Sequence, residues 1–318
     1  MAKKHNFKNY ISTFTFAILV GISTANATEA NGCNTVRFSD VGWTDITATT
    51  AVATVLLESI GYKTDVKVLS VPVTYRSMAS GDIDVFLGNW MPTMEADIAP
   101  YREAGTVETL TTNLTGAKYT LAVPKYTYEK GLKDFSDIAD FSEDLSGKIY
   151  GIEAGNDGNR IILDMIEEGA FGLSDFSLVE SSEAGMLSQV ARADRREKDI
   201  VFLGWAPHPM NSNFEVEYLS GGDDFFGPNF GGAEVMTNVR KGYAEECGNV
   251  GKFLKNLRFT LKMENDVMNA ILNDGEKPNE AAQAWIEKNP ESLNDWLAGV
   301  KTNDGKDALT AAKATLGL

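Results

Sequence analysis

Residues 84–94, DVFLGNWMPTM, have a near copy at residues 199–210, DIVFLGWAPHPM, so that Phe-Leu-Gly returns 116 positions later. Each stretch begins with an acidic residue, continues through an apolar run, and then places a tryptophan two residues before a proline. An apolar run without polar alternation is typical of a strand that is buried in a parallel sheet. We therefore predict that Trp90 and Trp205 lie just past the ends of two such strands.

The segments around each stretch repeat one order of strands and helices. In the first half the pattern predicts strands at 34–43, 63–71 and 83–88, and helices at 44–62 and 73–82. In the second half it predicts strands at 148–154, 176–182 and 198–205, and helices at 156–172 and 183–197. Alternation of strand and helix indicates an α/β fold with open, mostly parallel sheets, and the tryptophan strand is the third of each set.

The remaining segments connect the two halves. The pattern predicts a strand at 114–131 that crosses from the first half to the second, and a second strand at 230–242 that crosses back. From about residue 240 the chain predicts helices that pack back on the first half. We expect two α/β lobes, each an open sheet flanked by helices and joined by two crossing hinge strands. Lobe 1 would comprise residues 28–115 and 230–318, and lobe 2 residues 116–229.

Charge and the first residues limit the class of protein. The 318 residues carry a formal net charge of −16, which argues against a nucleic-acid partner because phosphate binding needs a basic face. Residues 1–27 contain three lysines, a short apolar core and Ala25-Asn26-Ala27, which together predict a secretory signal peptide cleaved near Ala27. The apolar core is too short for a membrane span of roughly 20 residues. We expect a protein that is exported and soluble after cleavage.

Two cysteines remain in the mature chain, Cys33 and Cys247. In an oxidising compartment a disulfide is the default for such a pair. The alternative is two buried free thiols. A metal site at the cysteines is disfavoured, because no histidine lies near either one and two ligands do not complete a site.

Aromatic residues collect where the strands are predicted to end, and ligands of open α/β sheets bind at the carboxyl ends of the strands. Tryptophan is mostly a packing residue, and we assign that role to Trp285 and Trp296 in the helical tail. Several rings at equivalent strand ends, with one acid, instead indicate an aromatic cage for a quaternary ammonium group. The predicted ligand-binding residues are Trp43, Asp45, Trp90, Tyr119, Asn156 and Trp205.

Three polar residues near these strand ends allow more than one interpretation. Asp45 suits a ligand with net positive charge, such as choline, but it also precedes a helix and could be its N-cap. Asn156 could bond to a ligand hydroxyl or be a turn residue. The glycine-rich turn at 153–160 could hold an anion on its N–H groups with Arg160 nearby, which would favour glycine betaine.

The sequence offers little for catalysis. His208 is the single histidine of the mature chain and stands between two prolines, where a structural role is expected. Common nucleophile and metalloprotease motifs are absent from the sequence. Asp223 and Asp224 lack the spacing of a calcium loop. We therefore predict no catalytic residues, no cofactor and no metal.

Five motifs resemble one known family, the periplasmic substrate-binding proteins of ABC transporters for glycine betaine, proline betaine and choline. They are DVGWTDITATTA, YRSMASGDIDVFLGNWMPT, KYTLAVP, GIEAGNDGN and FLGWAPHPMN, and they span nearly the whole mature chain in order. The resemblance implies the type II binding-protein fold and a cleft that closes on its ligand. It also implies a cage of Trp43, Trp90, Tyr119 and Trp205, with Asp45 and Asn156 as polar partners. The choline branch of the family is the most similar, and there a Cys33–Cys247 disulfide is expected.

From these observations we expect a receptor that is not an enzyme. It would capture choline, with acetylcholine as a further candidate, and deliver it as a monomer to an ABC permease and its ATPase subunit. A glycine betaine or proline betaine receptor is the alternative within the same fold. An exported enzyme that acts on choline esters, with His208 in its mechanism, is the alternative in another class. A sensor that signals to a chemoreceptor would use the same site.

Overall fold

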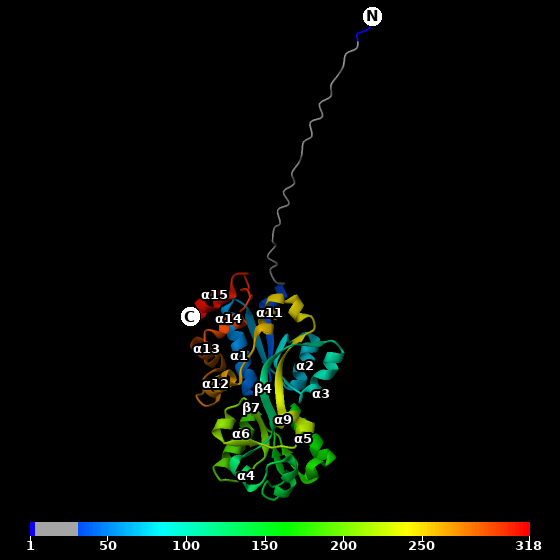
Figure 1. Cartoon of the computed structure of the whole chain (residues 1–318), viewed down its shortest axis with the longest axis vertical. Helices are drawn as coiled ribbons and strands as arrows, with labels where there is room; N and C mark the ends of the chain where they lie inside the picture. Colours follow the sequence, from blue (N-terminus) through cyan, green and yellow to red (C-terminus); the bar gives the residue numbers. More distant parts are fainter. Residues whose placement is uncertain (4–30) are drawn as a thin grey trace.

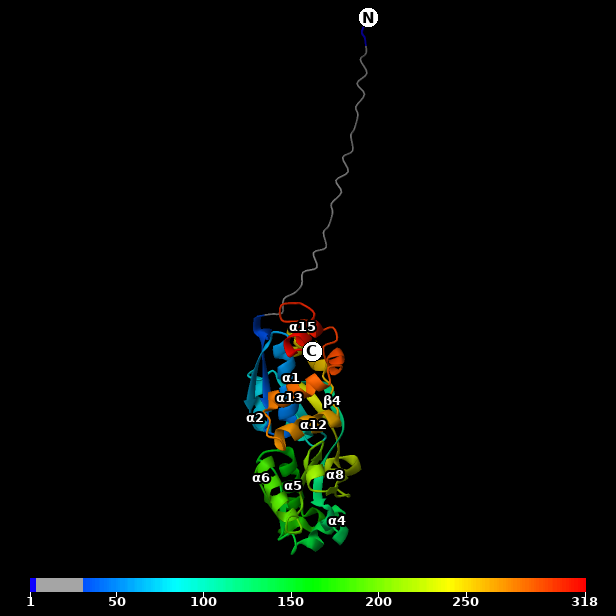
Figure 2. The same ribbon diagram turned by 90° about the vertical axis from the view of Figure 1, so that its left-hand side faces the viewer.

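The computed structural model describes residues 1–3 and 31–318 of the chain (Figure 1). The predicted signal peptide, with its cleavage near Ala27, lies outside the described residues apart from the first three. In the described part, no helix is both long enough and apolar enough to cross a bilayer. The body is elongated, with an upper and a lower group of helices in both views (Figures 1 and 2).

All nine strands of the described residues join one mixed sheet, in the order β2-β1-β3-β9-β4-β7-β5-β6, with β8 paired to β4. β1 pairs in parallel with β2 and β3, and β5 pairs in parallel with β6 and β7, as the alternating pattern predicted. The strands are β1 (Thr35–Asp40), β2 (Lys63–Val68), β3 (Val85–Met91), β4 (Val107–Pro124), β5 (Lys148–Tyr150), β6 (Ser177–Val179), β7 (Phe202–Ala206), β8 (Val216–Tyr218) and β9 (Gly232–Arg240).

The sequence predicted two separate sheets, one in each lobe, but β4 joins them into a single sheet. Its first part pairs with β9, from Val107 to Lys118, and its last part pairs with β7, from Lys118 to Ala122. The crossing strand predicted at 114–131 therefore begins seven residues earlier and ends at Pro124. A proline has no N–H to continue the ladder, and the chain turns there into a short helix, α4 (Lys125–Lys130).

The helices divide according to the crossing strands. Those before β4 or after β9 are α1 (Thr44–Ser59), α2 (Val71–Ser80), α3 (Glu95–Glu103), α10 (Tyr243–Glu246), α11 (Gly248–Asn256), α12 (Leu261–Leu272), α13 (Pro278–Lys288), α14 (Ser292–Trp296) and α15 (Ala308–Leu316). Those between the crossings are α4, α5 (Asp157–Glu168), α6 (Glu183–Asp194), α7 (Met210–Asn213), α8 (Asp223–Phe226) and α9 (Pro228–Gly231). Short 3-10 helices are η1 (Asn31–Asn34), η2 (Phe135–Phe141) and η3 (Ala170–Asp175).

Two predicted helices end earlier than the sequence suggested. α1 ends at Ser59 with Ile60 as its C-cap, and the expected glycine, Gly61, follows in a left-handed conformation with a φ of 89°. α5 ends at Glu168, and Gly169 caps it with a φ of 67°. Glycine takes this conformation without the steric cost of a Cβ, so the chain changes direction at both sites.

The repeated Phe-Leu-Gly has a packing reason in each half. A Cβ on Gly88 would lie 2.7 Å from Cδ1 of Ile46 in α1, and one on Gly204 would lie 2.7 Å from Cβ of Ala122 in β4. Glycine thus lets a neighbouring element approach each strand closely. The tryptophans lie within the last residues of β3 and β7 rather than past their ends, because β3 ends at Met91, three residues later than predicted, and β7 ends at Ala206, one residue later.

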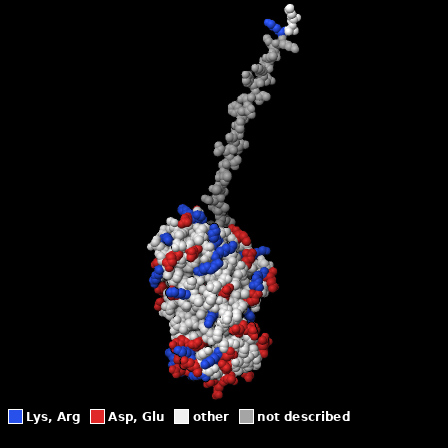
Figure 3. Space-filling model, viewed as in Figure 1, with Lys and Arg blue, Asp and Glu red and all other residues white. Residues whose placement is uncertain are grey.

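The C-terminal helices cover the upper half, as predicted. α12, α13 and α15 contact α1, and Trp296 is 4% exposed, with its ring 6.0 Å from that of Trp285. Cys33 and Cys247 form the disulfide that joins the start of β1 to the start of α11. On the face shown in Figure 3, basic side chains gather in the upper part of the body, and acidic and basic side chains are interspersed around its edges and at its lower end.

Candidate ligand-binding site

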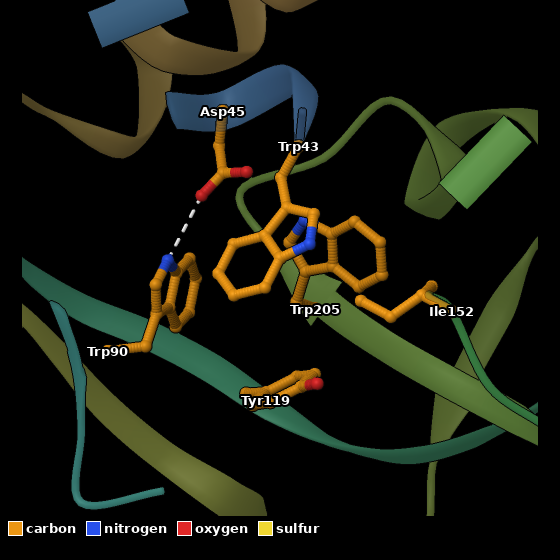
Figure 4. A pocket seen from close by; sticks show the side chains of 6 residues that line it. All are labelled: Trp43, Asp45, Trp90, Tyr119, Ile152 and Trp205. Carbon is orange, nitrogen blue, oxygen red and sulfur yellow. Dashed lines mark hydrogen bonds between the residues drawn. The ribbon is translucent and has the colours of Figure 1, made fainter. Parts of the chain in front are cut away.

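Side chains from both halves of the molecule line a small cavity. Trp43 and Asp45, at the start of α1, lie above Trp90 of β3 in Figure 4. Residues of β4, β7 and the loop after β5 complete the wall. The described residues that line the cavity are Trp43, Asp45, Trp90, Tyr119, Ile152 and Trp205. Five of these six are residues that the sequence predicted.

The aromatic rings that line the cavity lie close to one another at steep angles. Tyr119 and Trp205 are direct partners on the paired strands β4 and β7, with ring centroids 6.3 Å apart and planes at 83°. Trp90 lies 6.0 Å from Tyr119 at 60°. Together with Trp43, each of these side chains is at most 6% exposed. The rings therefore form a nearly closed apolar wall of the kind that attracts cations through its π-faces.

Asp45 supplies the negative charge at this wall. Its Oδ2 accepts a hydrogen bond of 3.0 Å from the indole N–H of Trp90, whereas Oδ1 is buried and has no partner among the described residues. Burial, followed by the charge of Glu183, raises the pKa of Asp45 to about 8, because both disfavour the carboxylate. A cation in the cavity would favour the charged form and satisfy the free oxygen.

The alternative role of Asp45 as helix N-cap is wrong. The N-cap of α1 is Trp43, which provides no side-chain hydrogen bond, and Asp45 lies inside the first turn. A negative charge in the first turn is still favourable, because the helix dipole places partial positive charge there.

Trp43 connects the two halves beside the cavity. Its indole N–H donates a hydrogen bond of 2.8 Å to Oε1 of Glu153, in the loop after β5. Burial raises the pKa of Glu153. The N–H of Trp205, by contrast, is buried without a partner among the described residues. Trp43 is thus oriented across the cleft, whereas Trp205 is held by packing.

Asn156 lies behind the cavity wall and is not one of its lining residues. It is the N-cap of α5, and its side-chain oxygen accepts a 2.8 Å hydrogen bond from the N–H of Asn159. The same oxygen lies 3.5 Å from the hydroxyl of Tyr119. Next to it, a Cβ on Gly158 would lie 2.0 Å from that hydroxyl. The start of α5 therefore positions Tyr119.

Three residues at the site were not selected from the sequence. Ile152 lines the cavity, but an aliphatic residue after a strand carries no chemical signal. Glu183 and His208 are 5% and 1% exposed and hydrogen-bond to each other across 3.1 Å. His208 was predicted to be structural, and it contacts the ring of Trp205 at 4.8 Å. Only the tertiary arrangement shows that these residues support the cage.

The structure gives no support for an anion site at Arg160 or for a metal site among the described residues. Arg160 donates hydrogen bonds to the carbonyl of Thr93 and, at 2.8 Å, to Asp97, so its guanidinium is paired across the cleft. Within residues 31–318, no group of three or more His, Cys, Asp or Glu could hold a metal ion. The polar character of the cavity itself comes from Asp45.

Two halves joined by crossing strands, with a cavity of buried aromatic side chains between them, define a two-lobed solute-binding protein. Residues 34–288 match the family model described as the substrate-binding domain of ABC-type glycine betaine transport systems. The chain belongs to this family, as its motifs predicted.

Three solved structures are similar over most of the chain. An ABC-transporter choline-binding protein in complex with choline is 66% identical, covers 91% of this chain and 100% of that one, and has a TM-score of 0.90. An ABC-transporter choline-binding protein in an unliganded semi-closed conformation is also 66% identical, covers 90% and 100%, and has a TM-score of 0.83. Lactococcal OpuAC in its closed conformation with glycine betaine is 27% identical, covers 82% and 98%, and has a TM-score of 0.75.

These similarities bear on fold and conformation. The fold is the two-lobed type II fold of periplasmic binding proteins, as predicted. Trp43, Trp90, Tyr119 and Trp205 are each at most 6% exposed, and the hydrogen bond from Trp43 to Glu153 joins the two halves beside the cavity. The structure therefore describes a closed arrangement of the lobes.

Proposed function

We propose that the protein is an exported receptor that binds choline between its lobes and delivers it to an ABC importer. The observation that carries the proposal is the buried, unpartnered Oδ1 of Asp45 in a cavity walled by four aromatic rings. The rings attract a quaternary ammonium that cannot donate hydrogen bonds, and the carboxylate selects a ligand with net positive charge. Acetylcholine shares this head group and is a further candidate.

The expected energies are sufficient for a receptor. Each ring contributes about 0.5–2 kcal/mol when water is excluded, so four rings supply about 2–8 kcal/mol. Micromolar affinity requires about 8 kcal/mol. The cage and the burial of the methyl groups can therefore account for most of the binding, and polar contacts orient the ligand. We propose that Asp45 and Asn156 are these polar partners, Asn156 through a small shift toward the ligand hydroxyl.

The proposed mechanism is closure around the ligand. Lobe 1, residues 28–115 and 230–318, presents Trp43, Asp45 and Trp90, and lobe 2, residues 116–229, presents Tyr119, Asn156 and Trp205. Closure completes the cage, so the ligand stabilises the closed state by its differential affinity. Transport would draw on the permease and the separate ATPase of the importer. The receptor itself would act as a periplasmic monomer after cleavage near Ala27.

Glycine betaine is the second candidate, because the family model carries its name. Its carboxylate would have to lie in the same cavity as Asp45, and the guanidinium of Arg160 is engaged by Asp97. An enzymatic role is disfavoured by His208, which does not line the cavity and uses both ring nitrogens in hydrogen bonds to Met210 and Glu183.

Calorimetric titration of the mature protein, residues 28–318, with choline and glycine betaine tests the proposal. We expect one choline site of micromolar or tighter affinity and weaker binding of betaine. Betaine binding at least as tight as that of choline would overturn the ligand assignment. Turnover of acetylcholine that is lost in His208→Ala would overturn the receptor assignment.

A further inference from the structure

Glu183, the first residue of α6 in lobe 2, reaches across the cleft to the start of α1 in lobe 1. Its Oε2 accepts a 2.9 Å hydrogen bond from the backbone N–H of Thr44, and its Oε1 accepts a 2.5 Å hydrogen bond from the Thr44 hydroxyl. The Glu183 side chain is 6% exposed. The contact thus joins the lobes in the interior and not at the rim.

This contact provides α1 with the cap that its own sequence lacks. The first N–H groups of a helix have no partner within the helix, and a serine, threonine or aspartate before the helix commonly supplies one. The N-cap of α1 is Trp43, whose side chain makes no cap hydrogen bond. Glu183 supplies both an acceptor and a negative charge at this end of the helix dipole, and it does so from the other lobe.

His208 fixes the orientation of Glu183. The Nδ1 of His208 accepts a 3.0 Å hydrogen bond from the N–H of Met210, so Nε2 carries the proton and donates to Oε1 of Glu183 at 3.1 Å. The same imidazole contacts the ring of Trp205. A continuous set of contacts therefore runs from Trp205 through His208 and Glu183 to Thr44.

The set ends beside the two lobe 1 residues that flank Thr44, the cage residues Trp43 and Asp45. Because the cap comes from lobe 2, it can form only when the lobes meet. In the open form water would bond to Thr44 and Glu183 instead. Breaking the contact therefore weakens the closed form and leaves the open form almost unchanged.

We propose that Glu183 is a positioning residue that caps α1 across the cleft upon closure and, through its charge beside Asp45, favours ligands with net positive charge. The inference rests on the proposed function and assigns part of its selectivity to a residue outside the cavity wall. Its charge already acts at Asp45, where it is the second cause, after burial, of the raised pKa. A cation between the lobes is stabilised by both acids, whereas a zwitterion also brings a carboxylate that both repel.

Three variants of the mature protein separate these roles. Glu183→Ala removes cap and charge, Glu183→Gln keeps an acceptor for the Thr44 N–H but removes the charge, and Glu167→Gln is the control. Glu167 is an exposed acid on α5 of the same lobe. Choline and glycine betaine affinities are measured by calorimetry, choline dissociation by stopped-flow fluorescence, and folding by the ligand-free melting temperature.

We expect Glu183→Ala to weaken choline binding by about 10- to 100-fold, mainly through faster dissociation, because it removes charge-assisted hydrogen bonds from the closed state. Glu183→Gln should lower the choline-to-betaine affinity ratio by about tenfold, since a charge at this range acts strongly in a buried site. Glu167→Gln should match the parent in both measurements. If Glu183→Ala does not fold, Glu183→Gln alone decides, through the ratio.

Choline affinity of a folded Glu183→Ala within threefold of the parent would contradict the capping role. Equal losses for choline and betaine in Glu183→Gln would contradict the selectivity role. If the parent protein itself does not bind choline, the proposed function fails and this inference fails with it; if the parent binds and the variants behave as the control does, the inference alone fails.

Discussion

Trp90→Phe and Trp205→Phe make the same chemical change in two walls of one cage, but the structure predicts unequal losses of choline affinity. Both variants keep an aromatic face toward the ligand and lose the indole N–H. The N–H of Trp90 donates to Asp45 at 3.0 Å, whereas that of Trp205 has no partner among the described residues. Trp205→Phe is therefore the matched control for the hydrogen bond of Trp90.

The two variants should differ because the hydrogen bond from Trp90 to Asp45 stabilises the closed form more than the open form. In the open form water can replace the indole as a donor to Asp45, but in the closed form the carboxylate is 1% exposed and water cannot reach it. A hydrogen bond to a charged group contributes about 1.5–3 kcal/mol, which corresponds to about 10- to 150-fold in affinity. The loss of choline affinity in Trp90→Phe should therefore exceed the loss in Trp205→Phe by this factor. Both variants should lose a similar further amount of affinity, because a phenyl ring attracts a cation less strongly than an indole ring does.

Calorimetry with choline at fixed pH measures both variants, and melting temperatures confirm that they fold. Losses that agree within about threefold, or a larger loss for Trp205→Phe, would refute the role assigned to the Trp90–Asp45 hydrogen bond. Combining each phenylalanine variant with Asp45→Asn tests whether the effect of Trp90→Phe depends on the carboxylate of Asp45. Without that carboxylate, the losses of choline affinity in the two phenylalanine variants should be equal.

Three more predictions follow from the same geometry. Burial raises the pKa of Asp45 from its ordinary value of 3.8 to about 8. A form that buries Asp45 therefore holds a proton there more tightly than a form in which water reaches the carboxyl group, so ligand-free closure should become less favourable as the pH rises from about 4 to 8. X-ray scattering measures this dependence, and choline should suppress it. A ligand-free protein that closes more at high pH would contradict it. Replacing both cysteines by serine should lower the free energy of unfolding, measured by denaturant titration, by up to about 5 kcal/mol, because the disulfide closes a loop of 214 residues. Choline affinity should stay unchanged, and a loss of affinity would show that the disulfide takes part in binding. Gly158→Ala places a Cβ 2.0 Å from the Tyr119 hydroxyl and should weaken choline binding by about 5- to 150-fold, whereas Gly248→Ala meets no atom within 4 Å and should have no effect.

The sequence predicted those parts of the site that depend on local pattern. Trp90 and Trp205 stand out because each comes after a buried apolar run in a repeated order of elements, and the ends of such strands meet at the ligand site. The family motifs then identified Trp43 and Tyr119. The disulfide was also predictable, because two cysteines in a chain with an expected signal peptide have one partner each.

The parts that escaped prediction depend on contacts between distant segments. Glu183 and Thr44 are separated by 139 positions, and only the closed lobes bring them together. The single sheet has the same cause, since β4 pairs with β9 and β7 at its two ends. Asp45 was interpreted as a possible N-cap because sequence places it next to a helix, but a difference of two residues puts it inside the first turn.

We propose that the two lobes together form a cage for a quaternary ammonium group. A crystal structure of the mature protein grown with choline would show whether they do. We expect the ammonium nitrogen within about 6 Å of the ring centroids of Trp43, Trp90, Tyr119 and Trp205, with a carboxylate oxygen of Asp45 facing the ligand. Choline bound outside this cavity, or inside it against rings of one lobe alone, would show that the two lobes do not form such a cage.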